Sequence, residues 1–129
     1  MQDVVTCNLE YARRAFELIA EPDIVDWTTI ITGCSYHVQA LEALKLSGKM
    51  LSCHVKPNSI TFVGILNACS HTRMVYLARE YLGSMSKVYG VKATSDHYNC
   101  MVDVYCRASH LEKAYELIKS GSFQLDAMS

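Results

Sequence analysis

Apolar residues recur along most of the chain at the spacing i, i+3, i+4, i+7, which is the period of an amphipathic α-helix. The stretches with this spacing come in pairs, and a short polar segment separates the two members of each pair. Residues 25–34 pair with 39–51, residues 60–70 with 75–88, and residues 96–107 with 111–120. The pattern predicts three helical hairpins in series.

The three hairpins are copies of one repeat, because shifting the chain by 35 or 36 residues superposes residues 24–58, 59–94 and 95–126. Residues 1–23 match the second half of such a segment, and residues 127–129 form a tail. Each copy has an aromatic residue near its start, an aliphatic residue four positions later and an alanine in its second half: Trp27, Phe62, Tyr98; Ile31, Leu66, Val102; Ala43, Ala78, Ala114. A small alanine lets the neighbouring helix approach closely. Since one hairpin cannot bury its own apolar face, we predict an all-α fold, an α-solenoid of stacked helix-turn-helix repeats.

Composition agrees with packed helices and limits the ligands. Half of the 129 residues are hydrophobic and only 19% are charged, which excludes a disordered chain. The net charge of -1 gives no general attraction for nucleic acid, so any RNA affinity must come from local placement and be sensitive to salt. We expect no membrane-spanning helix, and the first residues do not read as a secretory signal or a transit peptide.

The cysteines and histidines predict neither a metal site nor a redox motif. The six cysteines form no CxxC pair, and four lie in apolar helical runs, which favours buried free thiols over a disulfide framework. The histidines are expected at turns or on the surface: His37, His54, His71, His97, His110. His110 and Glu112 match only the first half of a cytidine deaminase motif, because no Pro-Cys-x-x-Cys follows. We therefore expect no enzymatic activity and no cofactor.

Two classes of helical repeat have about this length, the tetratricopeptide class that binds peptides and the pentatricopeptide class that binds RNA. The runs DIVDWTTII (23–31), VKPNSITFV (55–63) and DHYNCMVD (96–103) resemble plant pentatricopeptide repeat proteins of the subclass that mixes repeat lengths. The lengths 35, 36 and 32 are similar to the last three repeats before the C-terminal extensions of that subclass. Neither these extensions nor a deaminase-like domain is present in the sequence, so we expect a fragment of a longer editing-type protein.

The resemblance implies that the chain binds single-stranded RNA and that the fifth and last residues of each repeat select one base. These pairs are Thr28 with Asn58, Val63 with Thr94, and Asn99 with Asp126. By resemblance the first pair favours adenine, the third favours uracil, and the middle pair discriminates poorly. Short polar residues near helix starts and in loops also serve as caps and turn formers, which is the alternative interpretation of these positions.

Other residues would support RNA binding by packing or by charge. The resemblance implies that apolar residues at the second position pack against bases, which selects Val25 and Ile60, whereas Asp96 departs from the pattern. The candidate phosphate contacts are Lys56, Lys92 and Arg107.

The resemblance also implies a setting: transcript processing or cytidine-to-uridine editing in a mitochondrion or chloroplast, with editing or processing factors acting in trans and no DNA ligand. Two alternatives remain open. One is a peptide-binding or scaffolding solenoid, which the near-neutral charge favours, and the other is a degenerate fragment without independent activity.

The turns and one helix depart from the family pattern. The family has a glycine in the turn between the two helices of a repeat, which permits a left-handed backbone. Here Asn8, Val38, Arg73 and Ser109 occupy that place, so we expect looser turns. Ser47-Gly48 is expected to weaken the second helix of the first full repeat.

Overall fold

The computed structural model describes the backbone of residues 2–36 and 39–128 and the side chains of residues 10–36 and 39–120. The described backbone forms helices and no strand, in the order α1 (Gln2–Glu17), α2 (Ile24–Ser35), α3 (Ala40–Leu51), α4 (Ser59–His71), α5 (Val75–Lys87), α6 (Ser95–Arg107) and α7 (Leu111–Met128). The predicted all-α fold is confirmed, and the bounds of α2 to α6 lie within one residue of the predicted ones.

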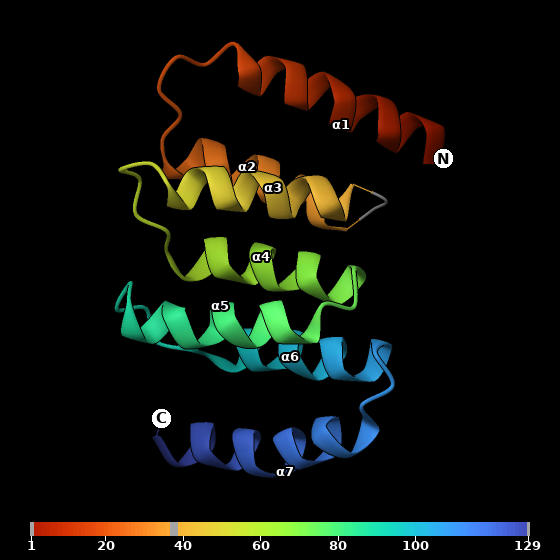
Figure 1. Ribbon diagram of the computed structural model, residues 1–129, viewed down its shortest axis with the longest axis vertical. Coiled ribbons are helices and arrows are strands. Elements are labelled where there is room, and N and C mark those ends of the chain that lie inside the picture. The colour runs from red at the N-terminus through yellow and green to blue at the C-terminus, as the bar shows by residue number, and fades with distance from the viewer. Residues whose placement is uncertain (1, 37–38, 129) are drawn as a thin grey trace.

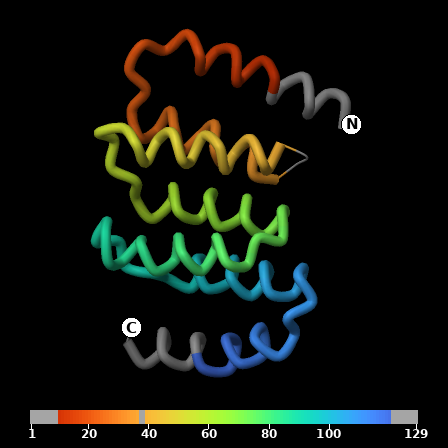
Figure 2. Tube along the Cα trace, viewed as in Figure 1, coloured from red at the N-terminus to blue at the C-terminus, as the bar shows by residue number. Residues whose placement is uncertain are grey.

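The helices stack in one column, with the two ends of the chain at opposite ends of the stack (Figure 1 and Figure 2). The first helices of the hairpins, α2, α4 and α6, pack side by side because α4 contacts both of the others. Each second helix packs against the first helix of its own hairpin, and α3 and α5 also contact the next one. Over the described residues α3 makes no contact with α5, nor α5 with α7. The first helices therefore form a continuous inner layer, and the second helices form a splayed outer layer.

Each first helix begins at a capping box, in which the N-cap residue and the residue three positions later exchange hydrogen bonds. These exchanges satisfy backbone N–H groups that have no partner within the helix. The pairs are Asp23 with Asp26, Asn58 with Thr61, and Thr94 with His97. The three caps bring the starts of α2, α4 and α6 to the same edge of the inner layer, on the left in Figure 1.

The core lies between the two layers and contains the residues that the repeat pattern selected in the first two repeats, whereas Tyr98 and Val102 of the third are only partly buried. Trp27, Ile31, Phe62 and Leu66 are buried, as are Ala43, Ala78 and Ala114, which confirms the role of alanine at the helix contacts. Phe16 joins α1 to this core, with its ring centroid 4.8 Å from that of Trp27. Helices α2 and α4 approach closely at Gly64 of α4, where an added Cβ would lie 2.9 Å from Thr32 Oγ1 of α2.

Two of the four turn positions keep the left-handed backbone of the family pattern, and at a third the predicted turn is absent. Arg73 and Ser109 have φ angles of 58° and 66°, the left-handed backbone that the glycine of the pattern would supply. Val38 lies outside the described residues. The turn expected at Asn8 is wrong, because α1 starts at Gln2 and no glycine or proline interrupts residues 2–17.

The last helix is longer than predicted. The apolar spacing predicted an end near residue 120, but α7 continues to Met128 through a segment that contains no proline. Asp126, which was expected in a loop, therefore lies within a helix.

Candidate nucleic-acid interface

The first residue of each proposed base-selecting pair lies on the inner layer near the capped edge. Thr28, Val63 and Asn99 each follow the N-cap residue of their helix by five positions, in α2, α4 and α6. Because these helices pack side by side, the three residues form a row across the layer. Residues widely separated in the sequence thus share one surface.

The structure brings Thr28 and Asn58 together through a third residue, Thr61. The Oγ1 atoms of Thr28 and Thr61 are 2.8 Å apart, and Thr61 Oγ1 donates to Asn58 Oδ1 at 3.0 Å. The backbone N–H of Thr61 also donates to Asn58 Oδ1, at 3.0 Å, and the N–H of Asn58 donates to Thr61 Oγ1, at 3.1 Å. Thr61 is buried, whereas Thr28 is partly exposed and Asn58 is exposed, so the two predicted residues face solvent around a buried link.

The second pair has no comparable link. Val63 is partly buried against the second half of the core, and Thr94 is exposed. The Thr94 Oγ1 atom lies 3.1 Å from Nδ1 of His97, and the Thr94 N–H donates to the same nitrogen at 2.9 Å. His97 is fully buried, with Nε2 2.9 Å from the carbonyl oxygen of Ser59. The prediction of a surface or turn histidine is wrong for His97, because its ring caps α6 and ties that cap to α4.

The structure describes the side chain of only one member of the third pair. Asn99 is exposed on α6, and its side chain has no hydrogen-bond partner among the described residues. Asp126 lies in α7, and its side chain is outside the described ones.

Two apolar side chains lie in solvent at the capped edge. Val25 and Ile60 are each 67% exposed, and they occupy equivalent positions in the first turns of α2 and α4. Asp96, at the equivalent position of α6, is also exposed. Leaving valine and isoleucine in water forgoes the stabilisation that burial of such side chains provides. The edge therefore presents two apolar faces next to the hydrogen-bonding group of Thr28, Asn58 and Thr61.

The three candidate phosphate contacts do not lie together. Lys56 and Lys92 are exposed in the loops that lead into α4 and α6, at the capped edge. Arg107 lies at the opposite end of α6, with its Nε 3.1 Å from Oδ2 of Asp103. Burial raises the pKa of the Asp103 carboxyl, but hydrogen bonds from Ser70 and Arg107 outweigh it and hold that pKa below its ordinary value. Arg107 is thus already paired with an ionised carboxylate.

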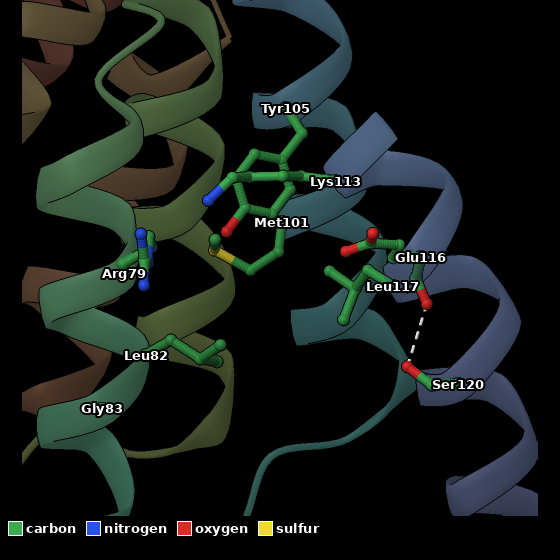
Figure 3. Close-up of a pocket in the computed structure, with 9 residues that line it drawn as sticks. All are labelled: Arg79, Leu82, Gly83, Met101, Tyr105, Lys113, Glu116, Leu117 and Ser120. Atoms are coloured by element: carbon green, nitrogen blue, oxygen red, sulfur yellow. Dashed lines mark hydrogen bonds between the residues drawn. The ribbon is translucent and has the colours of Figure 1, made fainter. Parts of the chain in front are cut away.

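A separate groove of about 450 Å³ lies between α5 and α7, with α6 beneath it (Figure 3). Its walls carry the cations Arg79 and Lys113, the acidic residue Glu116 and the aromatic ring of Tyr105. The groove exists because α5 and α7 do not touch. None of the residues that the sequence selected for RNA contact lines it.

The described cysteines are free thiols. Cys34, Cys69 and Cys100 are buried as predicted, whereas Cys53 and Cys106 are exposed. Burial raises the pKa of Cys69 to about 12 and that of Cys100 to about 11, so both remain protonated at neutral pH. No group of three or more His, Cys, Asp or Glu residues in the described part of the chain could hold a metal ion. No helix in the same part is long and apolar enough to cross a membrane.

Comparison with known proteins identifies the repeat. A model of the PPR repeat family matches residues 22–71, and a model of the PPR repeat matches residues 89–120, which together make up more than half of the chain. The chain belongs to the PPR repeat family. The two matches include the capped edges of α2, α4 and α6, so the candidate interface is built from PPR repeats.

Relatives of this PPR chain occur in Arabidopsis thaliana. A chloroplastic pentatricopeptide repeat-containing protein is 46% identical over 121 residues, which are 94% of this chain and 16% of the relative. A mitochondrial one is 42% identical over 120 residues, 93% of this chain and 18% of the relative. The chain thus spans less than a fifth of the length of these two curated relatives.

Two solved structures share the fold. The pentatricopeptide repeat protein PPR10 from maize superposes with a TM-score of 0.71 at 25% identity, covering 96% of this chain and 18% of that one. The PPR domain of Arabidopsis thaliana protein-only RNase P 1, in complex with tRNA, gives a TM-score of 0.72 at 19% identity, covering 92% of this chain and 66% of that one.

Sequence reasoning missed the buried residues behind the edge. Thr61 and His97 were not selected as site residues, although each follows a polar N-cap residue by three positions. That capping-box spacing is visible in the sequence and would have marked them as residues that orient Asn58 and Thr94.

Proposed function

We propose that this PPR chain binds single-stranded RNA along the capped edge of α2, α4 and α6, with one nucleotide at each repeat. The observation that carries the proposal is the pair of exposed apolar side chains, Val25 and Ile60, in the first turns of the two helices, α2 and α4, that the hydrogen bond between Thr28 and Thr61 joins. Bases in single strands are recognised by this combination of packing on their faces and hydrogen bonds to their edges.

The spacing of the inner helices suits a base. Packed helices lie roughly 8–10 Å apart, and Val25 and Ile60 occupy equivalent positions in the first turns of the packed helices α2 and α4. A planar base in van der Waals contact on both faces needs about 7–8 Å, twice the ordinary carbon–carbon contact distance. We propose that one base lies between the two side chains, with its edge directed towards Thr28 and Asn58. We propose that this repeat selects adenine and that Asn99, with Asp126, selects uracil, whereas Val63 and Thr94 select weakly.

The charge at the edge predicts weak, salt-dependent affinity. Lys56 and Lys92 are the cations placed to contact phosphates, but the exposed acidic residues Asp23 and Asp96 lie at the same edge. Two phosphate contacts give a slope of about -1.4 in a plot of log K against log salt concentration. Lys56→Ala should reduce that slope by about half, whereas Lys45→Ala, an exposed lysine of α3, should leave it unchanged.

The relatives suggest the biological setting. Their names place them in chloroplasts and mitochondria, and one structural neighbour was solved with tRNA. We propose that this chain is part of a longer protein of the subclass that mixes repeat lengths. That protein would recognise organellar transcripts for processing or cytidine-to-uridine editing, with other factors supplying the chemistry.

Binding to short RNA pools at low salt tests the proposal. Randomised single-stranded decamers are titrated against the wild type, Thr28→Val and Asn99→Val, with Thr29→Val, an exposed threonine of α2, as the matched control. We expect Thr28→Val and Asn99→Val each to change base preference at one position, and the control to bind as the wild type does. Absence of binding below about millimolar RNA would reject RNA as the ligand, and unchanged preferences in both variants would reject Thr28 and Asn99 as base-selecting residues.

A further inference from the structure

The hydroxyl of Thr61 lies at the centre of the hydrogen-bonded group behind the first proposed base site. Thr61 is fully buried, and its Oγ1 contacts Thr28 Oγ1 at 2.8 Å, Asn58 Oδ1 at 3.0 Å and the Asn58 N–H at 3.1 Å. A hydroxyl has one proton to donate and two lone pairs to accept with. Three partners therefore occupy its full hydrogen-bonding capacity.

The partners determine where each proton goes. Asn58 Oδ1 has no proton, so the Thr61 hydroxyl donates to it, and the Asn58 N–H donates to Thr61. The 2.8 Å contact between the two threonine hydroxyls allows either to donate. With the Thr61 proton on Asn58 Oδ1, the remaining lone pair of Thr61 accepts, and the hydroxyl proton of Thr28 then points towards Thr61. The chain of donors runs from Thr28 to Thr61 to Asn58, and hydrogen bonds aligned in this way reinforce one another.

This arrangement fixes what each exposed residue offers to a ligand. Thr28 has used its proton and presents oxygen lone pairs, so it acts as an acceptor. Asn58 Oδ1 accepts from both the N–H and the hydroxyl of Thr61, while its Nδ2 group has no partner among the described residues and points its donors outwards. The first site therefore pairs one acceptor with one donor, in a fixed order.

We infer that Thr61 is a specificity-determining positioning residue for the first proposed base site, because it takes the Thr28 proton and so makes Thr28 an acceptor for the base. This inference rests on the proposed function. Adenine matches the site, with an amino group that donates to Thr28 and a ring nitrogen that accepts from Asn58. Hypoxanthine, the base of inosine, carries the reverse order, with a carbonyl acceptor in place of the amino group and a ring N–H donor.

The second proposed base site, formed by Val63 and Thr94, has a different residue, His97, at the place that Thr61 occupies in the first. His97 accepts at Nδ1 from the Thr94 N–H and lies 3.1 Å from the Thr94 hydroxyl, but Val63, the counterpart of Thr28, has no polar atom for it to orient. A link between the two selecting residues thus exists at the first site and not at the second, and a Thr61 variant should alter recognition of one nucleotide only.

The test uses decamers of uridine with one central adenosine, purine riboside or inosine. Binding of each is measured by fluorescence anisotropy for wild type, Thr61→Val, Thr61→Ser and the control Thr29→Val. We expect the wild type to bind the adenosine decamer roughly tenfold tighter than the inosine one, the ratio expected for one directed hydrogen bond. Thr61→Val frees the Thr28 proton to rotate, so the ratio should fall below about threefold. Thr61→Ser restores the hydroxyl and should keep the wild-type ratio, as should Thr29→Val.

The outcomes separate the two proposals. If the wild type binds none of the decamers, the proposed function fails and this inference fails with it. If the wild type prefers adenosine and folded Thr61→Val keeps that preference, the inference is wrong while RNA binding stands. Should Thr61→Val not fold, Thr61→Cys, with a weakly bonding thiol of similar size, replaces it, and an unchanged ratio in that variant would overturn the inference.

Discussion

Gly48 lies in the interior of α3, in a position where the chain gains nothing from a glycine. No atom comes within 4 Å of a Cβ built on this residue, and its backbone does not have the positive φ that favours glycine. Its carbonyl oxygen accepts hydrogen bonds from the N–H of Ser52 at 3.2 Å and from the Ser52 hydroxyl at 2.7 Å, and alanine keeps both. Glycine costs about 0.8–1.0 kcal/mol relative to alanine in a helix interior. Gly48→Ala should therefore raise the free energy of unfolding by about 1 kcal/mol.

Thermal unfolding followed by far-UV circular dichroism measures this change. For a chain of this size, 1 kcal/mol corresponds to a rise of about 3–5 °C in Tm. The matched control is Gly90→Ala, where φ is +67° and the substitution should instead cost roughly 1–2 kcal/mol. Opposite signs for the same chemical change would support the assigned backbone of both residues. A Gly48→Ala protein that is no more stable than the wild type would refute the reasoning about α3.

The thiols and one carboxylate give two further predictions. Cys53 and Cys106 should react with iodoacetamide in the native state at mildly alkaline pH, while Cys69 and Cys100 should stay unmodified because burial keeps them protonated. Mass spectrometry of the alkylated protein measures the labelling rate of each thiol. Labelling of Cys69 and Cys100 at a rate similar to that of the exposed pair would contradict the prediction. The lowered pKa of Asp103 means that its ionised form stabilises the fold above the ordinary value of 3.8 and that this stabilisation is lost as pH falls through the lower folded pKa. Asp103→Asn should therefore make the free energy of unfolding less dependent on pH in the acid range. If that free energy falls equally steeply with decreasing pH in the two proteins, the ion pair of Asp103 with Arg107 does not stabilise the fold.

The repeat explains why so much of the fold could be predicted from the sequence. Each hairpin in the middle of the chain has a copy on at least one side, and Phe62 and Ala78 recur in register with Trp27 and Ala43. Because stacked hairpins cover each other's apolar faces, these four residues are buried. The chain ends lack this guide, because the turn at Asn8 was inferred from a single alignment. At this end the local helix propensity of residues 2–17 prevails, and α1 continues through Asn8 without a turn.

The candidate site was predictable only in part. The row of Thr28, Val63 and Asn99 follows from the repeat spacing alone. The bond between Thr28 and Thr61 joins residues 33 positions apart on different helices, so it depends on how closely α2 and α4 pack. The sequence already shows that Arg107, at the end of a first helix, lies away from Lys56 and Lys92, which precede the starts of first helices.

The place where RNA contacts the protein decides whether the capped edge is the binding surface. Backbone amide chemical shifts are recorded by heteronuclear NMR while a single-stranded decamer is added at low salt. We predict that saturable shifts concentrate in the first turns of α2 and α4, around Val25, Thr28 and Ile60. Shifts confined to the groove around Arg79 and Lys113, or no saturable shift at all, would contradict RNA binding at the capped edge.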